Sequence, residues 1–496
     1  MNRLLAEVLS HIESTPSGNA FYIDNKYYSY EQFGHRIAAI RRRVAGLSKE
    51  NRIVGLAIHD DLDTYASIFA LWLEGRAYVP LHPYHPLDRN KGIISQIGLS
   101  TVIDSVEVSP FSEYDVICTG SLLSDTEGGA APVDVADSEL AYVLFTSGST
   151  GVPKGVCITR GNVAAFMDSF WRTGISINVE DRCLQCFDLT FDVSVQSYLV
   201  ALTRGACVYT VPYGQVKYLY VAELIQEQRI TFGALAPSML IYLRPYFNEF
   251  DATSLKYCIL TAEACPIDLL KDWFKCAANA DLYDFYGPTE ATIYCTYYKL
   301  DRFGMNLSVN GIVSIGRPLT HVKAVILDED GNLLTTGQRG ELCIAGEQVT
   351  PGYWKYPEKN ASSFFMKEIE GLCYRFYHTG DLCYWDASGN IMYIGRIDQQ
   401  AKIQGFRVEL SEIEFHAMTF YQQKHRVLAV AFNNEKGLTE IAMFIESAPC
   451  DTDELNRYLR TKMPSYMIPS RYIFEEVFPL NSSDKIDRNK LKQRLV

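Results

Sequence analysis

Apolar and polar residues follow two different rhythms along this chain of 496 residues. Short runs rich in β-branched residues, among them "RIVGLAI", "LAYVLFT", "KYCILTA" and "VKAVIL", predict buried strands. Longer segments with helical spacing, such as "TYASIFALWLEG" and "DLLKDWFKCAANA", lie between such runs. Strands that alternate with helices are typical of the α/β class, so we expect parallel or mixed sheets.

The pattern changes twice towards the C-terminus. After about residue 310 the strands become short and turn signals such as "DEDGN" and "DASGN" separate them, which predicts a β-rich subdomain. Beyond "GRIDQQAKI" the chain has its own strand and helix pattern in "HRVLAVAFN", "TEIAMFIE" and "TDELNRYLRTKM". We therefore predict a large N-terminal domain over 1–397 and a small α+β domain over 398–496.

No segment has the hydropathy of a membrane span. "MNRLLAEVLSHIES" predicts an amphipathic helix, and the most apolar region is interrupted by Glu74 and Arg76 before about 18 apolar residues accumulate. The net charge of −13 argues against nucleic acid as a partner, because phosphate backbones are bound by clustered lysines and arginines. We expect a cytoplasmic protein with no membrane insertion.

The 13 cysteines are an odd number and lie mostly in apolar contexts. This usage favours reduced thiols in the core over a disulfide framework. Cys183 and Cys186 form a CxxC pair, but no second pair accompanies them, so packing is the favoured interpretation.

The segment "LFTSGSTGVPKGV" carries the first candidate chemistry. It lacks the Walker A pattern, because Lys154 is followed by Gly155 instead of Ser or Thr. Its hydroxyls could donate hydrogen bonds to an anion, and Gly148 and Gly151 would let backbone N–H groups approach it. On these residues alone, an exposed turn is the other interpretation.

Further segments decide between these interpretations. "TSGSTGVPKG", "YSYEQF", "LEGRAYVPL", "FDLTFDVSV", "YGPTEATI", "GELCIAGE", "YHTGDLCYW", "GRIDQQAKIQGFRVELSEIE" and "NSSDKIDRNKL" are spread over the whole chain. Together they resemble the motifs of the adenylate-forming superfamily, which includes acyl- and aryl-CoA synthetases, luciferases and the adenylation domains of nonribosomal peptide synthetases. The resemblance implies ATP and Mg²⁺ as cofactors, an acyl-adenylate intermediate, transfer to a thiol, and a mobile C-terminal lid.

The resemblance also implies roles for individual residues. Lys485 would bridge the substrate carboxylate and the α-phosphate, Glu290 would hold Mg²⁺, and Lys154 would neutralise phosphate charge. Tyr286 would stack on adenine and Asp381 would accept from the ribose hydroxyls. The full set of expected nucleotide contacts is Thr146, Ser147, Gly148, Ser149, Thr150, Gly151, Asp284, Tyr286, Gly287, Thr289, Asp381 and Arg396.

Two positions depart from a simple assignment. Asp284 stands where related enzymes often carry Asn, so it could accept from the adenine amino group but not donate to a ring nitrogen. His378 has no evident chemical task and is expected to be structural.

In the lid, the resemblance assigns three positions. Asp398 would be the hinge about which the lid rotates between the two half-reactions. After rotation the segment from Lys402 to Arg407 would face the active site. Gly405 would leave room for the pantetheine arm of the thiol substrate.

Asp192 indicates the class of acid, because members that activate amino acids pair this carboxylate with the substrate ammonium group. The remaining pocket residues would be Val193, Gln196, Ala234, Ile259, Thr261, Phe285, Ile293 and Tyr294. None of these eight is charged, so we expect a small or medium, mostly apolar amino acid. Proline, alanine and glycine remain open, as does the stereochemistry, and "FDLTFDVSV", "YGPTEATI" and "ELSEIEFH" most resemble D-alanine:carrier protein ligases.

The expected acceptor is a 4′-phosphopantetheinyl carrier protein. The chain contains neither a carrier-type "GGxS" motif nor a condensation-type "HHxxxDG" motif, so we expect the carrier to be loaded in trans. Two alternatives remain beside this ligase: an acyl- or aryl-CoA ligase, which Asp192 argues against, and a catalytically silent nucleotide-binding protein.

Overall fold

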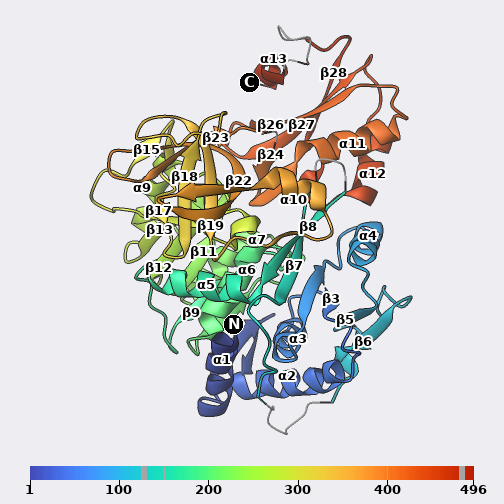
Figure 1. Ribbon diagram of the computed structural model, residues 1–496, viewed down its shortest axis with the longest axis vertical. Helices are drawn as coiled ribbons and strands as arrows, with labels where there is room; N and C mark the ends of the chain where they lie inside the picture. Colours follow the sequence, from blue (N-terminus) through green and yellow to red (C-terminus); the bar gives the residue numbers. More distant parts are fainter. Residues whose placement is uncertain (124–130, 149–151, 399, 480–485, 487, 496) are drawn as a thin grey trace. The chain divides into compact units, whose positions relative to one another are not determined.

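The computed structural model describes residues 1–123, 131–148, 152–398, 400–479, 486 and 488–495 (Figure 1). The chain forms two compact units, each assembled from three segments. The first unit contains Met1–Pro83, Ile94–Leu144 and Gly155–Ile397, and the second contains Tyr84–Ile93, Phe145–Lys154 and Asp398–Val496. Among the helices of the described residues, none has both the length and the hydropathy needed to cross a lipid bilayer.

The largest sheet of the first unit has nine strands in the order β17-β14-β13-β12-β11-β9-β10-β1-β2. The strands from β13 to β1 in this order all pair parallel, and β2, β14 and β17 pair antiparallel at the edges. The bounds are β1 Asn19–Ile23, β2 Lys26–Ser29, β9 Arg182–Gln185, β10 Cys207–Thr210, β11 Phe232–Leu235, β12 Tyr257–Thr261, β13 Asp281–Tyr286, β14 Thr296–Lys299 and β17 Arg317–Pro318.

A second sheet has seven strands in the order β20-β8-β7-β4-β3-β5-β6. β3 pairs parallel with β4 and β5, and β20 pairs antiparallel with β8. The bounds are β3 Ile53–Ala57, β4 Ala77–Leu81, β5 Thr101–Asp104, β6 Asp115–Cys118, β7 Leu140–Thr146, β8 Lys154–Thr159 and β20 Gly352–Tyr353. The chain therefore has the mixed sheets that the apolar runs predict.

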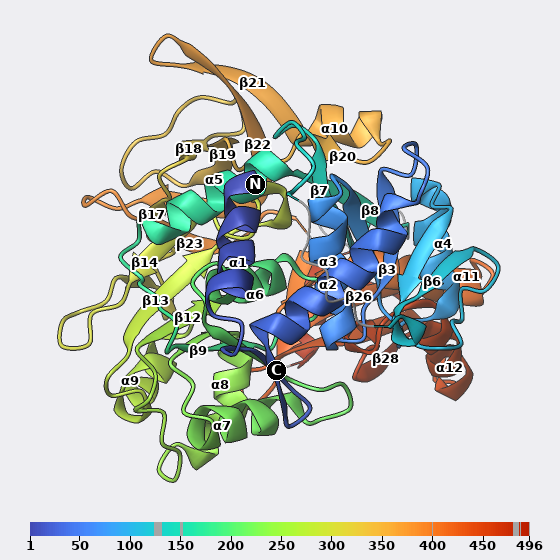
Figure 2. The same ribbon diagram turned by 90° about the horizontal axis from the view of Figure 1, so that it is seen from below.

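Most helices between these strands bury an apolar face. Their bounds are α1 Asn2–Ser14, α2 Tyr30–Ala45, α3 Leu62–Leu73, α4 Leu87–Ile97, α5 Arg160–Trp171, α6 Asp192–Leu202, α7 Lys217–Glu227, α8 Pro237–Leu243, α9 Ile267–Cys276 and α10 Pro357–Ser363. However, α10 buries only Ser363, and α4 lies mainly in the second unit. One large core joins α1, α2, α3, α5 and α6, and a second joins α7, α8 and α9, which gather together in Figure 2. α6 is buried along its whole length, including the polar side chains in its N-terminal half, whereas its C-terminal half is a continuous apolar run.

The β-rich part of the first unit is a five-stranded antiparallel sheet of β18, β19, β22 and β21, with β23 paired to β22. The bounds are β18 Val322–Leu327, β19 Gly340–Gly346, β21 Phe364–Ile369, β22 Leu372–Trp385 and β23 Ile391–Arg396, and a separate hairpin pairs β15 Ser308–Val309 with β16 Ile312–Val313. The register between β19 and β22 shifts between Glu341 and Cys343, so β22 bulges near residue 380. This bulge carries one of the predicted site residues.

The second unit has its own apolar core. A hairpin of β24 and β25 precedes α11, and the three-stranded sheet β26-β27-β28 packs with α11 and α12. The bounds are β24 Gln400–Ile403, β25 Phe406–Glu409, α11 Leu410–Phe420, β26 Val427–Asn433, β27 Thr439–Glu446, α12 Asp453–Lys462, β28 Arg471–Glu475 and α13 Arg488–Lys492.

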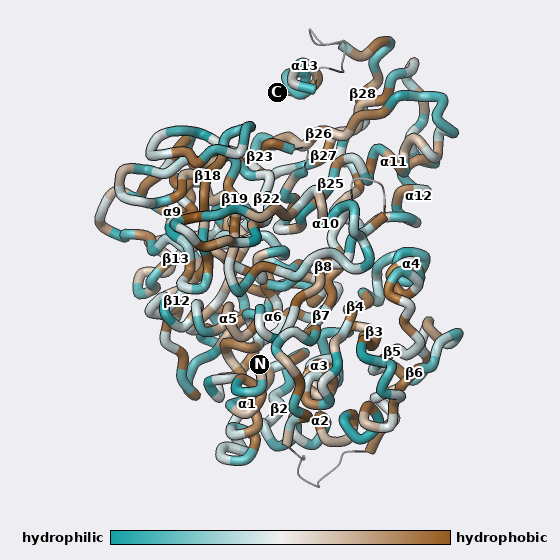
Figure 3. The backbone as a smooth tube through the Cα atoms, in the orientation of Figure 1, coloured by the Kyte–Doolittle hydropathy of each residue, from teal (hydrophilic) through white to brown (hydrophobic). Residues whose placement is uncertain are grey.

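The structure confirms the predicted α/β class and each strand and helix that the sequence pattern singled out. "LAYVLFT" is β7, "VKAVIL" is β18, and the amphipathic N-terminal segment is α1. Figure 3 shows hydrophobic residues along many strands and hydrophilic residues along many connecting loops, which is the alternation expected from the sequence.

Candidate functional site

The carboxylate of Asp192 is the centre of the predicted amino-acid site. Asp192 is the first residue of α6 and is only 5% exposed. The backbone N–H of Ile293 donates to its Oδ2 atom at 3.1 Å. Burial raises the pKa of Asp192 to about 6 against the opposing effect of the Ile293 N–H, and the nearby Glu290 carboxylate acts in the same direction as burial. A carboxylate at a helix N-terminus is also stabilised by the helix dipole.

Most of the other predicted pocket residues belong to the same buried core as α6. Ala234 pairs with Ile259 across β11 and β12, and Thr261 pairs with Phe285 across β12 and β13. Because side chains alternate along strands, these four residues lie on one face of the sheet. The same buried core contains Val193, Ala234, Ile259, Phe285, Ile293 and Tyr294. The structure thus brings the predicted pocket residues together.

Gln196 differs from its apolar neighbours in this group. It is fully buried, and its Oε1 atom accepts from the Tyr294 hydroxyl at 3.4 Å. Its Nε2 atom has no hydrogen-bond partner within the described part of the chain. A buried donor without a partner is costly, and a ligand atom that accepts from it would remove this cost.

The loop that holds Ile293 has an unusual backbone. Thr292 and Ile293 have φ values of 56° and 70°, a region that β-branched residues rarely adopt. A Cβ atom on Gly287 would lie 2.5 Å from the carbonyl oxygen of Ile293 and 2.6 Å from the Cα atom of Tyr294. The loop therefore folds back on its own backbone, and only glycine fits at position 287. Strained backbone of this kind is frequent at functional sites.

Two residues that the sequence patterns did not indicate brace this loop. The side-chain Nε2 atom of Gln348 donates a hydrogen bond to the Tyr294 carbonyl at 2.6 Å. The backbone carbonyl of Gln348 accepts a hydrogen bond from the Thr292 hydroxyl at 2.5 Å. The Thr350 N–H donates to the Glu290 carbonyl at 2.9 Å. Both residues lie in or beside "VTPGYW", and their contacts join positions far apart in the sequence, so no local spacing indicates them.

Glu290, the predicted magnesium ligand, is fully buried. The Tyr353 hydroxyl donates to its Oε1 atom at 2.7 Å, which orients the carboxylate. A single oriented carboxylate fits Mg²⁺, which takes one or two protein carboxylates and completes its octahedral shell with phosphate oxygens and water.

The predicted nucleotide residues of the first unit lie on the opposite side of β13. Tyr286 follows Phe285 and so points to the other face of the strand, into the core beneath the β-rich sheet. Its hydroxyl donates a hydrogen bond to Oδ2 of Asp381. Arg396, the Cα partner of Asp381 on β23, donates to Oδ1 at 3.0 Å. Tyr286, Asp381 and Arg396 thus form one connected group.

Two further features support this group. The Thr379 hydroxyl accepts a hydrogen bond from the Asp381 N–H, and the Thr379 backbone carbonyl accepts one from the Arg396 guanidinium group. Thr379 therefore helps to position both Asp381 and Arg396. Asp284 is buried on the same strand as Tyr286. Gly287 belongs to the strained loop, and Thr289 begins a short 3₁₀ turn that carries Glu290.

His378 and Glu341 lie beside the bulge that carries Asp381. Nδ1 of His378 is 2.8 Å from Oε2 of Glu341, and Oε1 of Glu341 accepts from the Gly380 N–H at 2.9 Å. Glu341 therefore links the histidine to the bulge.

The glycine-rich segment belongs to the second unit, where Ser147, Gly148 and Lys154 already have partners. The Ser147 hydroxyl donates to the Arg407 carbonyl and accepts from the Glu409 N–H. The Gly148 N–H donates to the Glu412 carboxylate at 3.2 Å, and Lys154 Nζ lies 3.7 Å from the Glu409 carboxylate. Carboxylates thus occupy donors that the prediction assigns to phosphate.

Four predicted residues lie outside the described residues: Ser149, Thr150, Gly151 and Lys485. Thr146 ends β7, and its buried hydroxyl has no partner within the described ranges.

The three lid positions have local structural roles. Asp398 accepts from the Gln400 N–H at 3.1 Å. Lys402 lies on β24 opposite Arg407, and Gln404 and Gly405 form the two-residue turn between the strands. Both turn residues have positive φ, 50° and 85°, as hairpins of this length require. The turn alone therefore explains a glycine at position 405.

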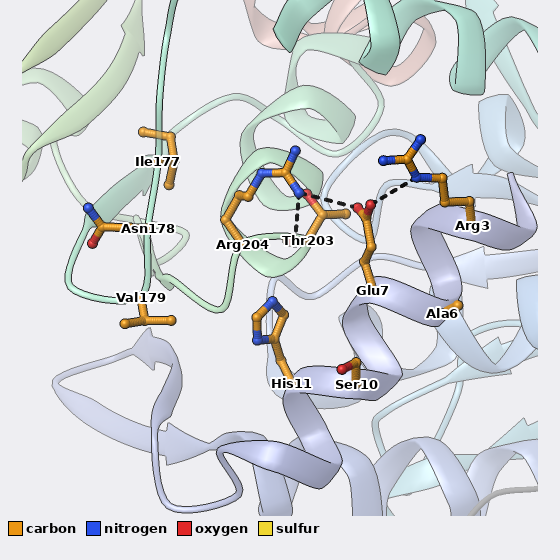
Figure 4. A pocket seen from close by; sticks show the side chains of 10 residues that line it. All are labelled: Arg3, Ala6, Glu7, Ser10, His11, Ile177, Asn178, Val179, Thr203 and Arg204. Atoms are coloured by element: carbon orange, nitrogen blue, oxygen red, sulfur yellow. Dashed lines mark hydrogen bonds and ion pairs between the residues drawn. The ribbon is translucent and has the colours of Figure 1, made fainter.

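A surface pocket of the first unit lies between α1, the 177–179 segment and the end of α6 (Figure 4). Glu7 lies between Arg3 and Arg204, at 3.2 Å and 3.5 Å, so its carboxylate offsets part of the positive charge of the two guanidinium groups. None of the predicted site residues lines it.

The chain resembles known proteins along most of its length. A protein family described as AMP-binding enzyme matches residues 10–354. A linear gramicidin synthase of Brevibacillus parabrevis is 32% identical over 494 residues, which cover 97% of this chain but only 9% of that protein. The chain thus spans less than a tenth of this relative.

Two solved structures share the fold over 99% of this chain. One is the Vibrio cholerae adenylation domain AlmE in complex with glycyl-adenosine-5′-phosphate, with a TM-score of 0.86, 24% identity and 97% of that chain covered. The other is holo-PA1221, a nonribosomal peptide synthetase protein containing adenylation and carrier (PCP) domains, with a TM-score of 0.85, 21% identity and 84% of that chain covered.

The strained loop generates a first prediction. Gly287→Ala should destabilise the protein by about 1–3 kcal/mol, because the new Cβ meets backbone atoms that cannot rotate away. The apparent melting temperature measures this effect. Gly233→Ala is the matched control, since its Cβ would meet only the Leu184 side chain at ordinary contact distance. Equal melting temperatures for the two variants would contradict the tight-loop assignment.

Proposed function

The chain belongs to the AMP-binding enzyme family, and from this premise we propose that it activates a small or medium, mostly apolar amino acid with ATP. The product is an aminoacyl-adenylate, and pyrophosphate leaves. The aminoacyl group then passes to the phosphopantetheine thiol of a carrier protein.

The buried Asp192 carboxylate is the observation that carries the choice of an amino acid. Within the described residues, this carboxylate has no cationic partner. Apart from backbone N–H groups of its own helix turn, it accepts a hydrogen bond from the Ile293 N–H. An ammonium group of the substrate would pair with this charge in a site from which water is excluded. A deaminated acid offers no such partner.

The surroundings of Asp192 support a limit on the substrate side chain. Phe285 and Tyr294 have ring centroids 5.0 Å apart and narrow the space near the helix end. Ala234 is the smallest side chain of the group and would take up the least space in such a pocket. A charged substrate side chain would find no partner among the eight uncharged residues, so it is disfavoured. The Nε2 atom of Gln196 could donate to a backbone or side-chain oxygen of the substrate.

We further propose that the nucleotide binds at the group of Tyr286, Asp381 and Arg396. The Asp381 carboxylate would accept hydrogen bonds from the ribose hydroxyls. Its Oδ2 atom already accepts one from the Tyr286 hydroxyl, so the ribose would either replace this bond or add a second bond to the same oxygen. Arg396 keeps the carboxylate in position from the other side. Glu290 would hold Mg²⁺, which when bound supplies positive charge to the phosphates.

The first half-reaction needs charge neutralisation more than a base. The substrate carboxylate is already ionised at neutral pH, and one of its oxygens bonds to the α-phosphorus while the bond to pyrophosphate breaks. Lys154, Ser147 and the Gly148 N–H are the described donors that could offset the repulsion between the two anions. To do so they must exchange the contacts that they make within the second unit. Lys485 is proposed as the second lysine at the reacting atoms.

In the second half-reaction the carrier thiol loses its proton, the carbon–sulfur bond forms and AMP leaves. We propose that rotation about Asp398 brings Lys402 and the Gln404–Gly405 turn towards the thiol. The hairpin gives this turn a defined shape, which supports a role as one wall of the thiol path.

We propose that the acceptor is a 4′-phosphopantetheinyl carrier that lies outside these 496 residues and is loaded in trans. The similar proteins include a gramicidin synthase and a protein with adenylation and carrier domains, which supports an acceptor of this kind. Peptide-synthetase adenylation and D-alanine:carrier ligation are both compatible with it.

ATP–pyrophosphate exchange against a panel of amino acids tests the proposal. The panel contains the proteinogenic amino acids, D-alanine, β-alanine and several deaminated acids. We expect exchange with one or a few small apolar amino acids, and preference for D-alanine over L-alanine would identify D-alanyl transfer. Exchange with deaminated acids alone would replace the proposal with an acyl- or aryl-CoA ligase. No exchange with any acid would indicate a silent nucleotide-binding protein.

Asp192→Asn provides a second prediction. The amide keeps the shape of the side chain but removes its charge, so kcat/KM for the preferred amino acid should fall on the order of 10²- to 10³-fold. The deaminated analogue of the same amino acid is the matched control, because it makes no ion pair and should lose little. A similar loss for both acids would contradict the ammonium-binding role.

The raised pKa of Asp192 predicts a pH dependence. Because its pKa in the free enzyme is about 6, the ionised form that pairs with ammonium is depleted below that pH. The kcat/KM for the amino acid should therefore fall about tenfold per pH unit below about pH 6 and level off above it. The profile should flatten in Asp192→Asn. If kcat/KM of this variant still falls below about pH 6, the group that titrates is not Asp192.

A further inference from the structure

Glu341, Cys343 and His378 gather on one face of the β-rich sheet, although the proposed reaction uses none of them. Cys343 and His378 are Cα partners on the antiparallel strands β19 and β22. Glu341 stands two residues before Cys343 and therefore lies on the same face of β19. One ligand atom from each residue lies within 4.8 Å of the others: the thiol sulfur, the ring nitrogen and a carboxylate oxygen.

The Glu341 carboxylate and the Cys343 thiol both face one ring nitrogen of His378 and make competing demands on it. Nδ1 of His378 is 2.8 Å from the Glu341 carboxylate and 3.7 Å from the Cys343 sulfur. If Nδ1 carries a hydrogen it satisfies the carboxylate, and the thiol then faces a donor. If Nδ1 carries none it can accept from the thiol, and the carboxylate then faces a lone pair. A divalent cation in place of the hydrogen accepts electron pairs from all three groups.

We propose that Glu341, Cys343 and His378 bind one Zn²⁺ ion, with water as the fourth ligand. Thiolate, imidazole and carboxylate are the three ligand types that zinc uses in proteins. Tetrahedral zinc with ordinary bond lengths separates a sulfur and a nitrogen ligand by about 3.6 Å, and a nitrogen and an oxygen ligand by about 3.4 Å. The observed separations of 3.7 Å and 2.8 Å are close enough to these values for small side-chain rotations to supply the difference.

The three proposed ligands lie at the boundary between the buried core and the solvent. Cys343 is fully buried, and the Phe365 ring packs on His378 with centroids 4.4 Å apart. The side chains of His378 and Glu341 are 39% and 23% exposed, which leaves an entry path and a position for water. Burial raises the pKa of the Cys343 thiol, so the thiol is protonated without metal. On binding, the S–H proton passes to water as the S–Zn bond forms, and affinity therefore rises with pH.

A bound ion would stabilise a part of the chain beside the nucleotide group. Glu341 also accepts the Gly380 N–H, and Asp381 is the next residue along β22. Metal binding to the folded state would join β19 and β22 at the bulge and raise the apparent melting temperature. This consequence does not depend on the proposed reaction, so it can be measured without any substrate.

Cobalt and zinc titrations of the chelator-treated full chain test the site. Co²⁺ bound through a thiolate gives a near-ultraviolet charge-transfer band, which we expect at one equivalent per chain. The band should disappear in Cys343→Ser and persist in the control Cys373→Ser, whose thiol is exposed on the same sheet in β22. Competition with a chromophoric chelator should show that His378→Ala and Glu341→Gln each weaken Zn²⁺ binding at least about tenfold.

Three results would overturn the proposal. The first is an unaltered chain that gives no thiolate band and no change of melting temperature with Zn²⁺, which would leave only a hydrogen-bonded His378 and Glu341 pair. The second is a band that survives in Cys343→Ser, and the third is a band that vanishes in Cys373→Ser, because either would place the metal elsewhere. If circular dichroism shows that Cys343→Ser does not fold, the partly exposed Glu341→Gln decides in its place.

Discussion

The hydrogen bond from the Ile293 N–H to the Asp192 carboxylate joins the two elements on which the candidate site depends. One is the buried helix α6, which begins at Asp192, and the other is the loop that returns from the end of β13. The N–H can point at the carboxylate only because Thr292 and Ile293 adopt positive φ values. That conformation is costly for β-branched residues, and Gln348 and the absence of a side chain at Gly287 hold it in place. The position of Asp192 therefore rests on contacts from residues far away in the sequence.

Strand β13 divides the site into two chemical environments. Phe285 faces the apolar core that contains Val193, whereas Tyr286 faces the core below the β-rich sheet and donates to Asp381. Alternation along a single strand thus separates the candidate acid-binding residues from the candidate nucleotide-binding residues by one peptide unit. The loop that follows β13 carries Glu290, so a metal there would lie close to both groups. A shift of register by one residue would exchange the two environments and destroy both.

Sequence patterns predicted the α/β class and the particular strands and helices that they singled out, and the family resemblance named the residues around Asp192 and Asp381 before their contacts were known. Strand runs and motif order carry that information because they depend on local periodicity and on short matched segments. The patterns did not reveal Gln348 or Tyr353, because their bracing contacts span more than 50 residues and leave no local spacing. They also could not show that Glu341, Cys343 and His378 meet, since this depends on strand pairing and on a bulge. Gly405 shows the opposite problem, because the motif assigns this glycine a role at the thiol path. The two-residue hairpin turn already accounts for a glycine at this position.

Charge balance explains why so much of the candidate site consists of acidic groups, although both proposed substrates carry an anionic group that reacts. Asp192, Glu290 and Asp381 are all buried, and Asp381 is held by Arg396, whereas Asp192 has no cationic partner within the described part of the chain. An amino acid brings an ammonium group and ATP brings Mg²⁺, so each anionic substrate would arrive with a cation that a buried carboxylate can bind.

The glycine-rich segment follows the same logic in reverse. Two of its donors, the Gly148 N–H and the Lys154 ammonium group, contact the carboxylates of Glu412 and Glu409 in the second unit, so at these two donors phosphate would replace one anion with another. Glu412 lies in the first turn of α11 and also contacts Arg89, which belongs to the same unit. Exchange of anions of this kind would therefore couple nucleotide binding to the contacts that α11 makes within its own unit.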